Sequence, residues 1–266
     1  MRRAIPDPVR LLEAIGRPLV AGIDWVLTAL GLAARALAAA PDLVRAPMRQ
    51  EFQRSLRLAM QGSLAHVALF SLLLGMTLIG QALYWLTLAG QSGLVRTLMV
   101  DALTREAAPV LVAMVLLARV GTGTLIELAA VRTGPAWRGL HGQGIDPFRL
   151  LAAPRAFATA AAGLAHTVIA VAIASLGGHL TALALGASTL RPVHFLASVL
   201  DGMYIQDFLL VALKGPVLGF TATFCTAIVA LASVELAREP AKLVQRGLAL
   251  GATSVIAVSL LLSTLL

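Results

Sequence analysis

Charged residues and cysteine are both scarce in this chain of 266 residues. Only 13% of the residues are Asp, Glu, Lys or Arg, whereas 59% are hydrophobic and the mean hydropathy is +0.88. That composition is too apolar for an ordinary soluble domain. The single cysteine, Cys225, has no second cysteine with which to form a disulfide within the chain. The alternation of apolar and polar residues that a membrane β-barrel needs is also missing. These absences exclude a soluble domain, an internally disulfide-bonded domain and a β-barrel.

Long runs without charge are present, and they determine the predicted fold class. Residues 58–95, 156–190, 215–234 and 247–266 contain no Asp, Glu, Lys or Arg. Each run can cross a hydrocarbon core ~30 Å thick, for which a helix needs about 20 residues. We predict an all-α integral membrane protein with five transmembrane helices, at residues 62–89, 95–131, 156–186, 207–234 and 247–266.

The N-terminal region has a different composition. Residues 1–58 hold nine arginines and five acidic residues among leucine, valine and alanine. Their apolar residues recur at helical spacing, as in Ile15, Leu19, Ile23 and Val26. This pattern predicts one or two amphipathic helices that lie on the membrane face, and a soluble helix hairpin is the alternative. We therefore divide the chain into an interfacial region, 1–58, and a five-span domain, 59–266.

The distribution of basic residues predicts the orientation. Segments 132–155 and 235–246 are rich in arginine and lysine, whereas the loops between the other span ends hold few. By the positive-inside rule, both segments and residues 1–58 are cytoplasmic. An odd number of spans then places the N-terminus in the cytoplasm and the C-terminus outside. The net charge of +8 follows from this bias and from attraction to anionic lipid, so no nucleic-acid partner is expected.

Several charges fall inside the predicted spans, where they are expensive and usually functional. Arg105 and Glu106 lie within the outer half of the predicted second span, and Arg119 and Glu127 lie further along it. The last two are eight positions apart, about 12 Å along a helix, so they cannot pair with each other. Each needs a partner elsewhere, an aqueous cavity or the cytoplasmic interface. Lys214 is the only charge in the interior of the fourth span, and the simpler interpretation is an ammonium group that reaches the interface.

Motifs for catalysis and nucleotide binding are missing. The sequence has no Walker A motif, no GxSxG, no HExxH and no cysteine pair. His66, His166 and His179 lie in apolar runs without metal-ligand spacing, so we expect packed histidines rather than metal ligands. We predict that the chain is not an enzyme and binds no metal and no ATP.

One pattern of residues extends over positions 75–155. It comprises Gly75-Met76, Gln81, Arg105-Glu106, Pro109, Arg119-x-Gly121-Thr122, Glu127-Leu128, Arg132, Gly144-Ile145-Asp146-Pro147 and Pro154-Arg155. This pattern resembles the MlaE (YrbE) family of ABC-transporter permeases, which belong to lipid-transport systems associated with MCE proteins. Lys214 also falls where that family has a lysine in its fourth span.

The resemblance implies a complex in the bacterial inner membrane. This chain would pair with a second permease copy or a paralogue, a cytoplasmic ABC ATPase subunit would bind the ATP, and this chain would bind no cofactor. Phospholipid would pass to or from a periplasmic MCE-domain protein, often to maintain outer-membrane lipid asymmetry. Residues 133–147 would contain the helix that couples to the ATPase, and Arg119 and Glu127 would be structural charges. The implied coupling residues are Arg132, Trp137, Arg138, Leu140, Asp146 and Pro147, and the implied lipid-cavity residues are Leu78, Gln81, Tyr84, Arg105, Glu106 and Lys214.

The coupling segment departs from the family pattern. Where the family has Thr-Glu-Gln-Ile-(Asp/Glu)-Ala-Leu, residues 134–140 are Gly-Pro-Ala-Trp-Arg-Gly-Leu, which changes the electrostatics of docking. A proline can still open a helix at this position. Two alternatives remain: an ion-coupled secondary carrier with Glu106, Glu127 and Lys214 as its relay, and a non-transporting membrane scaffold.

Overall fold

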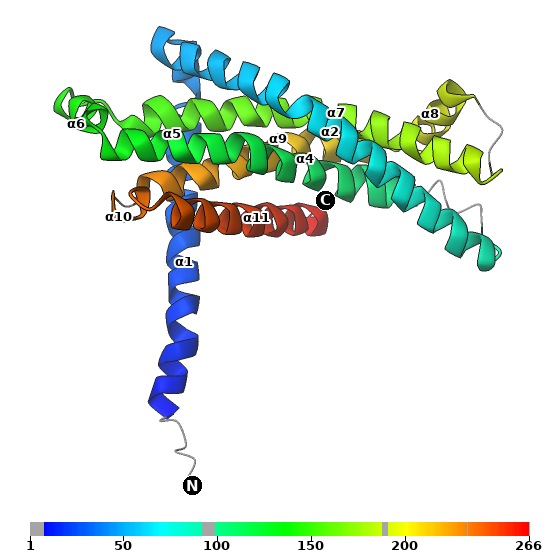
Figure 1. Ribbon diagram of the computed structural model, residues 1–266, viewed down its shortest axis with the longest axis horizontal. Coiled ribbons are helices and arrows are strands. Elements are labelled where there is room, and N and C mark those ends of the chain that lie inside the picture. Colours follow the sequence, from blue (N-terminus) through cyan, green and yellow to red (C-terminus); the bar gives the residue numbers. More distant parts are fainter. Residues whose placement is uncertain (1–7, 92–98, 188–190, 233, 266) are drawn as a thin grey trace.

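The computed structural model describes residues 8–91, 99–187, 191–232 and 234–265, and their secondary structure is helical (Figure 1). Among these residues, five helical segments are long and apolar enough to cross a membrane: Ala46–Leu88, Asp101–Thr133, Phe148–Ala184, Ile205–Ala232 and Pro240–Leu265. The predicted all-α membrane fold with five spans is thus confirmed. The predicted start of the second span, residue 95, lies outside the described residues.

The first span belongs to a helix that is much longer than the membrane is thick. Helix α2 (Ala46–Leu88) has 43 residues and continues through residue 58, where the composition changes. At 1.5 Å per residue it is about 65 Å long, roughly twice the thickness of a hydrocarbon core. Its first turns, which carry several arginines, therefore extend beyond the core.

The second span is assembled from four helical segments in line. The π-helical segment η3 (Met99–Ala107) leads into α4 (Ala108–Leu116), a second π-helical segment η4 (Leu117–Gly121) follows, and α5 (Thr122–Thr133) completes the span. Such π-helical turns occur frequently at functional sites. Here they contain Arg105, Glu106 and Arg119, three of the charges singled out from the sequence.

Small residues allow the central helices to approach closely. The π-helical segment η5 (Phe148–Ala152) leads into α7 (Ala153–Ala184), which packs between α2 and α9 (Ile205–Ala232). A Cβ atom added to Gly75 of α2 would lie 1.8 Å from a backbone oxygen of α7, and one added to Gly219 of α9 would lie 2.4 Å from another. Close backbone packing of this kind replaces the hydrophobic driving force that is absent between helices in lipid. Helix α11 (Pro240–Leu265) packs on α9.

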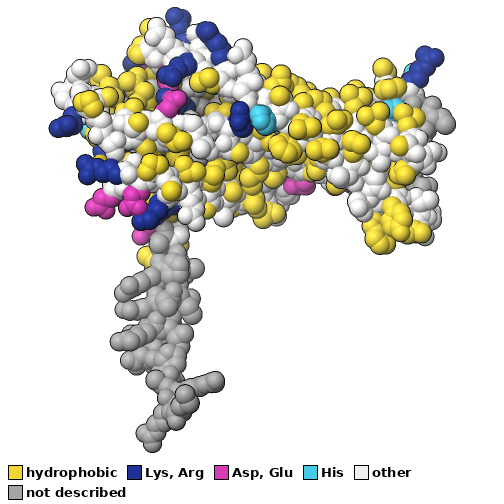
Figure 2. Space-filling view, viewed as in Figure 1, with side chains coloured by type: hydrophobic (Ala, Val, Ile, Leu, Met, Phe, Trp, Pro, Cys, Tyr) yellow, Lys and Arg dark blue, Asp and Glu magenta, His cyan; other side chains and the backbone are white. Residues whose placement is uncertain are grey.

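The two ends of the bundle differ. One end carries α6 (Pro135–Gly142) and α10 (Val234–Ala237), and the opposite end carries the short helix α8 (Pro192–Leu200), which lies between the third and fourth spans in the sequence (Figure 1). On the face drawn in Figure 2, charged side chains gather at the α6 end, and the middle of the bundle is mostly apolar.

Helix α1 (Pro8–Ala38) runs across the direction of the spans at the charged end (Figure 1). Ile23, Leu27 and Leu30 are 52%, 62% and 62% exposed, whereas Ala36 is fully buried against the bundle. The short helix η1 (Ala40–Val44) joins α1 to α2. This arrangement is compatible with an apolar face laid on lipid, and the interfacial position of α1 stays a prediction.

Candidate functional site

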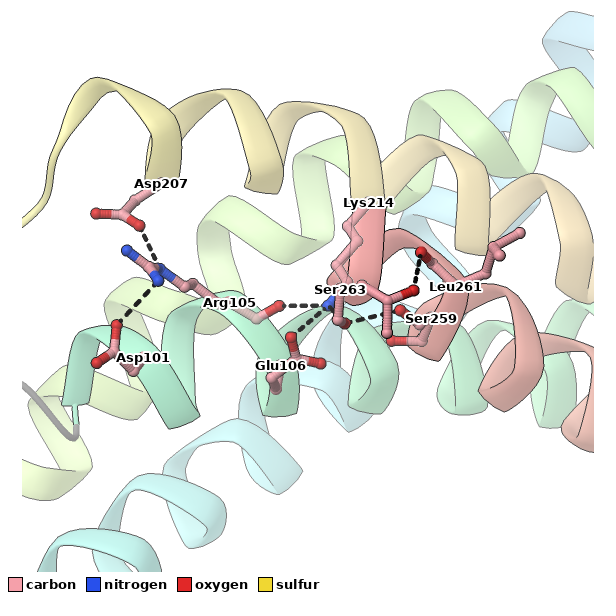
Figure 3. Close-up of polar contacts among 9 residues, drawn as sticks. Asp101, Arg105, Glu106, Asp207, Lys214, Ser259, Leu261 and Ser263 are labelled. Atoms are coloured by element: carbon pink, nitrogen blue, oxygen red, sulfur yellow. Dashed lines mark hydrogen bonds and ion pairs between the residues drawn. The ribbon is translucent and has the colours of Figure 1, made fainter. Parts of the chain in front are cut away.

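A polar cluster lies between η3, α9 and α11 (Figure 3). It contains Arg105, Glu106 and Lys214, three of the charges that the sequence places inside the predicted spans. Lys214 of α9 is fully buried, and its Nζ donates to Glu106 Oε1 at 2.7 Å, to the Arg105 carbonyl oxygen at 3.0 Å and to Ser263 Oγ at 2.7 Å. An ammonium group has three donors, so all of them are used. The simpler interpretation of the sequence, an ammonium that reaches the interface, is therefore wrong, because the ammonium is buried and fully hydrogen-bonded.

Proline explains why a lysine can be accommodated here. Arg105 lies near the junction of η3 with α4, where α-helical pairing of its carbonyl would run to residue 109, and Pro109 has no backbone N–H to donate. Lys214 donates to that carbonyl instead. Exposed backbone polar groups are tolerated inside a membrane only when they are satisfied in this way. Glu106, whose side chain is 46% exposed, supplies the opposite charge.

Arg105 forms a second part of the cluster. Its Nε donates to Asp207 Oδ1, and its Nη1 lies 3.2 Å from Asp101 Oδ1, one helical turn earlier (Figure 3). Asp207 is buried, and its Oδ2 accepts the Tyr204 backbone N–H at 2.7 Å, which caps the start of α9. Asp207 was not among the predicted site residues. The sequence signal that could have identified it is an acidic side chain in the first turn of an otherwise apolar span.

The cluster faces a cavity of about 400 Å³. Arg105 and Glu106 line it from η3, Leu209 and Leu213 line it from α9, and Ser263 and Leu265 line it from α11, together with Gln206, Asp207 and Leu210. Four leucines form the apolar part of its wall, and the polar part carries one guanidinium and two carboxylates. Such a cavity suits an amphiphile with a polar or charged end.

The predicted cavity residues of α2 lie elsewhere in the single chain. Leu78 packs in a core cluster with Ile79 and Leu103, and Gln81 is exposed. Tyr84 is 60% exposed and lines a separate hollow of about 810 Å³ beside the end of α7. Because α2 packs on α7 rather than on α9 and α11, one chain does not bring these residues to the cavity of Arg105 and Glu106.

A second charged cluster lies nearer the α6 end. Arg155 of α7, with a side chain only 8% exposed, bridges Glu51 of α2 at 2.6 Å and Glu127 of α5 at 2.9 Å. Arg54 lies 4.0 Å from Glu127. Glu127 thus finds its partners on other helices. It is 21 residues from Glu106 along the second span, or roughly 30 Å, so the proposed ion relay is split between two separate clusters.

The predicted coupling residues fall into two groups. The first group lies on α6 or beside it, and α6 has no buried residue. Trp137, Arg138 and Leu140 belong to α6. Arg132 lies at the end of α5, and its guanidinium stacks 4.2 Å from the centre of the Trp137 ring. Asp146 and the buried Pro147 belong to the junction with α1 instead. Asp146 accepts from Arg35 at 2.6 Å and from the Phe148 backbone N–H at 3.0 Å.

The same junction contains a second ion-paired aspartate, Asp42 of η1. Arg149 donates to its Oδ2, and Arg45 lies 3.1 Å from its Oδ1. The hydrogen bond from Arg149 is the main reason that the pKa of the Asp42 carboxyl lies below its usual value, and the charges of Arg149 and Arg45 act in the same direction. These pairs hold η1 and α1 against the start of the third span.

Five apolar spans with ion-paired charges between them define a multi-pass helical membrane protein. The chain matches the family Permease MlaE over residues 52–265, and it therefore belongs to the MlaE permease family. It is a membrane permease subunit of a transporter, as the resemblance in the sequence indicated. No curated protein matches the chain.

Proposed function

We propose that this chain moves phospholipid across or out of the bacterial inner membrane as the permease subunit of an ABC transporter. A separate cytoplasmic ATPase subunit would dock on α6 and supply the energy. A second permease copy or a paralogue would complete the lipid pathway, and a periplasmic MCE-domain protein would exchange the lipid. The N-terminus would lie in the cytoplasm and the C-terminus in the periplasm. Family membership supports this assignment. The strongest structural support is the arrangement of the second span.

The second span connects the exposed helix α6 to the polar cluster of Arg105, Glu106 and Lys214, and this connection is the observation on which the proposal depends. Gly134 alone separates α6 from α5, and α5, η4, α4 and η3 continue in line to Glu106. The stacking of Arg132 on Trp137 attaches α6 to the end of α5. A movement of α6 would therefore shift the whole second span. Two π-helical segments, η3 and η4, lie along this connection, and such segments occur frequently at functional sites.

The two cations predicted for the cavity, Arg105 and Lys214, would have different roles. Lys214 is fully buried and has no free donor, so in this conformation it would act as a latch between η3, α9 and α11 rather than as a headgroup ligand. Arg105 lines the cavity and is 34% exposed, so it would meet a lipid phosphate if its pair with Asp207 opened. Bidentate guanidinium–phosphate pairs make this exchange favourable.

The charge distribution supports the proposed orientation. The ATPase would sit at the α6 end. Towards that end lie the Arg155 cluster with Glu51 and Arg54, and the ion-paired aspartates Asp42 and Asp146. A transporter with this orientation would expose α8 and the start of α9 to the periplasm. There the cavity of Arg105 and Glu106 would lie closer to the MCE-domain protein than to the ATPase.

The assignment is tested by recovery of the ATPase with full-length chain variants from native membranes. Trp137→Ala and Leu140→Arg change α6, and Val193→Ala, at a 76% exposed position of α8, serves as the control at the opposite end. We expect a nucleotide-binding subunit and ATP hydrolysis to be recovered with the wild type and with Val193→Ala, and both to be strongly reduced for the α6 variants. Equal recovery with all four chains, or recovery with none, would contradict the proposal.

A further inference from the structure

Helix α6, at the charged end of the bundle, presents charge of one sign (Figure 1). No aspartate or glutamate occurs from residue 128 to residue 145, whereas Arg132, Arg138 and His141 all lie in this stretch. Arg138 and His141 are exposed, and α6 has no buried residue. The two arginines therefore make the surface of α6 cationic.

The carboxylates that flank this stretch in the sequence are already engaged elsewhere. Glu127 lies 2.9 Å from Arg155 of α7, and Asp146 accepts from Arg35 of α1 at 2.6 Å. Arg132 Nε has no hydrogen-bond partner within the described residues. The cations of α6 thus keep their donors for water or for a partner outside the chain.

Trp137 gives this cationic surface a fixed shape. The Arg132 guanidinium lies 4.2 Å from the centre of the Trp137 ring, and the His141 ring meets that ring edge-on, with the centroids 4.9 Å apart. The end of the helix is closed by a hydrogen bond from the Ile145 N–H to the Leu140 carbonyl at 2.9 Å. Tryptophan and arginine are enriched at the energetic centres of protein interfaces, and side chains that are already ordered lose less entropy on binding.

The same contacts favour a protein over a membrane surface as the occupant of α6. A tryptophan that anchors a helix in a bilayer places its ring at the level of the headgroups. The Trp137 ring instead has Arg132 over one face and His141 at its edge. An acidic protein surface can pair with the exposed Arg138 while it covers the stack of Arg132 on Trp137.

We propose that the ATPase subunit receives α6 in an acidic cleft, with a carboxylate on Arg138 and a surface that covers the Arg132–Trp137 stack. This inference rests on the proposed function and names the chemistry of the partner at that docking site. Guanidinium–carboxylate pairs are directional and often bidentate. An ATPase with a basic cleft is rejected, because like charges then meet across the interface.

The test is zero-length cross-linking of the complex, purified with the full chain from native membranes in a non-ionic detergent. Arg138→Lys keeps the charge and provides an amine, which a carbodiimide joins only to a carboxylate in contact with it. The chain has two lysines of its own, Lys214 and Lys242, so the cross-links of the wild type define a small background. Arg191→Lys is the matched control, because Arg191 is an exposed arginine at the α8 end.

Charge reversal provides the second measurement, in which the amount of ATPase subunit recovered per chain is compared between Arg138→Glu and Arg191→Glu. Unchanged melting temperatures show that each variant is folded. We expect about tenfold less ATPase with Arg138→Glu than with Arg191→Glu or the wild type, the scale of one lost charge pair. Recovery with the wild type should also fall in about 1 M NaCl, where the Debye length is only about 3 Å.

We expect Arg138→Lys to be joined to an aspartate or glutamate of the ATPase subunit, located by peptide mass spectrometry, and Arg191→Lys not to be joined to that subunit. Normal recovery with Arg138→Glu, or no such cross-link in an ATPase complex of Arg138→Lys, would overturn the acidic cleft and leave the proposed function in place. An effect of Arg138→Glu that appears only with anionic lipid in the micelles would identify a headgroup as the occupant and overturn it too. Failure to recover any ATPase with the wild type would overturn both proposals.

Discussion

The buried ammonium of Lys214 provides the sharpest prediction about the energetics of the cluster. Its three hydrogen bonds tie η3 to α9 and α11, and only Glu106 neutralises its charge. Glu106→Gln keeps the shape and a hydrogen-bond acceptor but leaves the ammonium buried without a counter-ion. Lys214→Met removes the buried charge itself, and the partly exposed Glu106 carboxylate can then be hydrated through the cavity.

The expected magnitudes follow from this asymmetry. Breaking a fully buried pair from one side costs about 3–5 kcal/mol, and the 46% exposure of Glu106 reduces that value, so we expect Glu106→Gln to lower the free energy of unfolding by about 2–3 kcal/mol. Lys214→Met should lower it by about 1 kcal/mol, and the double variant should lower it by no more than that. The coupling energy between the two positions is then about 2 kcal/mol.

The measurement is unfolding of the purified chain in detergent micelles, followed by circular dichroism, for all four members of the double-mutant cycle. Lys242 and Glu239 provide the matched control, because they are a lysine–glutamate pair at 2.5 Å with side chains 72% and 55% exposed. We expect the control cycle to show less than about 0.5 kcal/mol of coupling. A Lys214–Glu106 coupling as small as that of the control would refute the account of the buried pair.

Three further variants test the packing and the ion pairs. Gly75→Ala should destabilise the chain by about 1–3 kcal/mol in a detergent unfolding titration, because the new methyl group meets an α7 backbone oxygen, whereas Gly62→Ala, with open space around it, should be neutral or slightly stabilising. Arg155→Gln should lower the unfolding free energy in the same titration by about 2–3 kcal/mol, since it leaves two facing carboxylates without their shared cation; an unchanged midpoint would show that the triad contributes nothing. Asp42→Asn should be less stable than the wild type at neutral pH. Because the folded-state pKa of Asp42 is lowered, this difference should be fully present above its ordinary pKa of 3.8 and shrink as the pH falls through and below that value, which a pH series of melting temperatures measures.

The fold class and the number of spans were predictable because they depend on local composition. Four charge-free runs and the largely apolar stretch from 95 to 131 are each long enough to cross a membrane, and the structure has helices at all five places. The boundaries were less predictable. Helix α2 begins at Ala46, well before the predicted first span at 62–89, and its first turns are held by Arg155 and its neighbours. Hydropathy does not report such contacts.

The partners of the charged residues were not predictable, because they are far apart in the sequence. Glu127 finds Arg155, and Arg105 finds Asp207, across 28 and 102 positions respectively. The sequence indicated that these charges needed partners but could not name them. It also grouped Lys214 with the cavity-lining residues, whereas the lysine is fully buried behind them. That distinction depends on Pro109 and on side-chain packing, which the composition of a single span does not reveal.

The central claim, that ATP hydrolysis on a partner subunit drives lipid movement through this chain, is tested most directly in proteoliposomes. The chain is reconstituted with its ATPase and its MCE-domain partner, and transfer of a fluorescent phospholipid to or from that partner is followed over time. We predict that transfer requires hydrolysable ATP and that Glu106→Gln strongly slows it while the complex stays assembled. Transfer that is independent of ATP, or that follows an imposed ion gradient instead, would contradict the account.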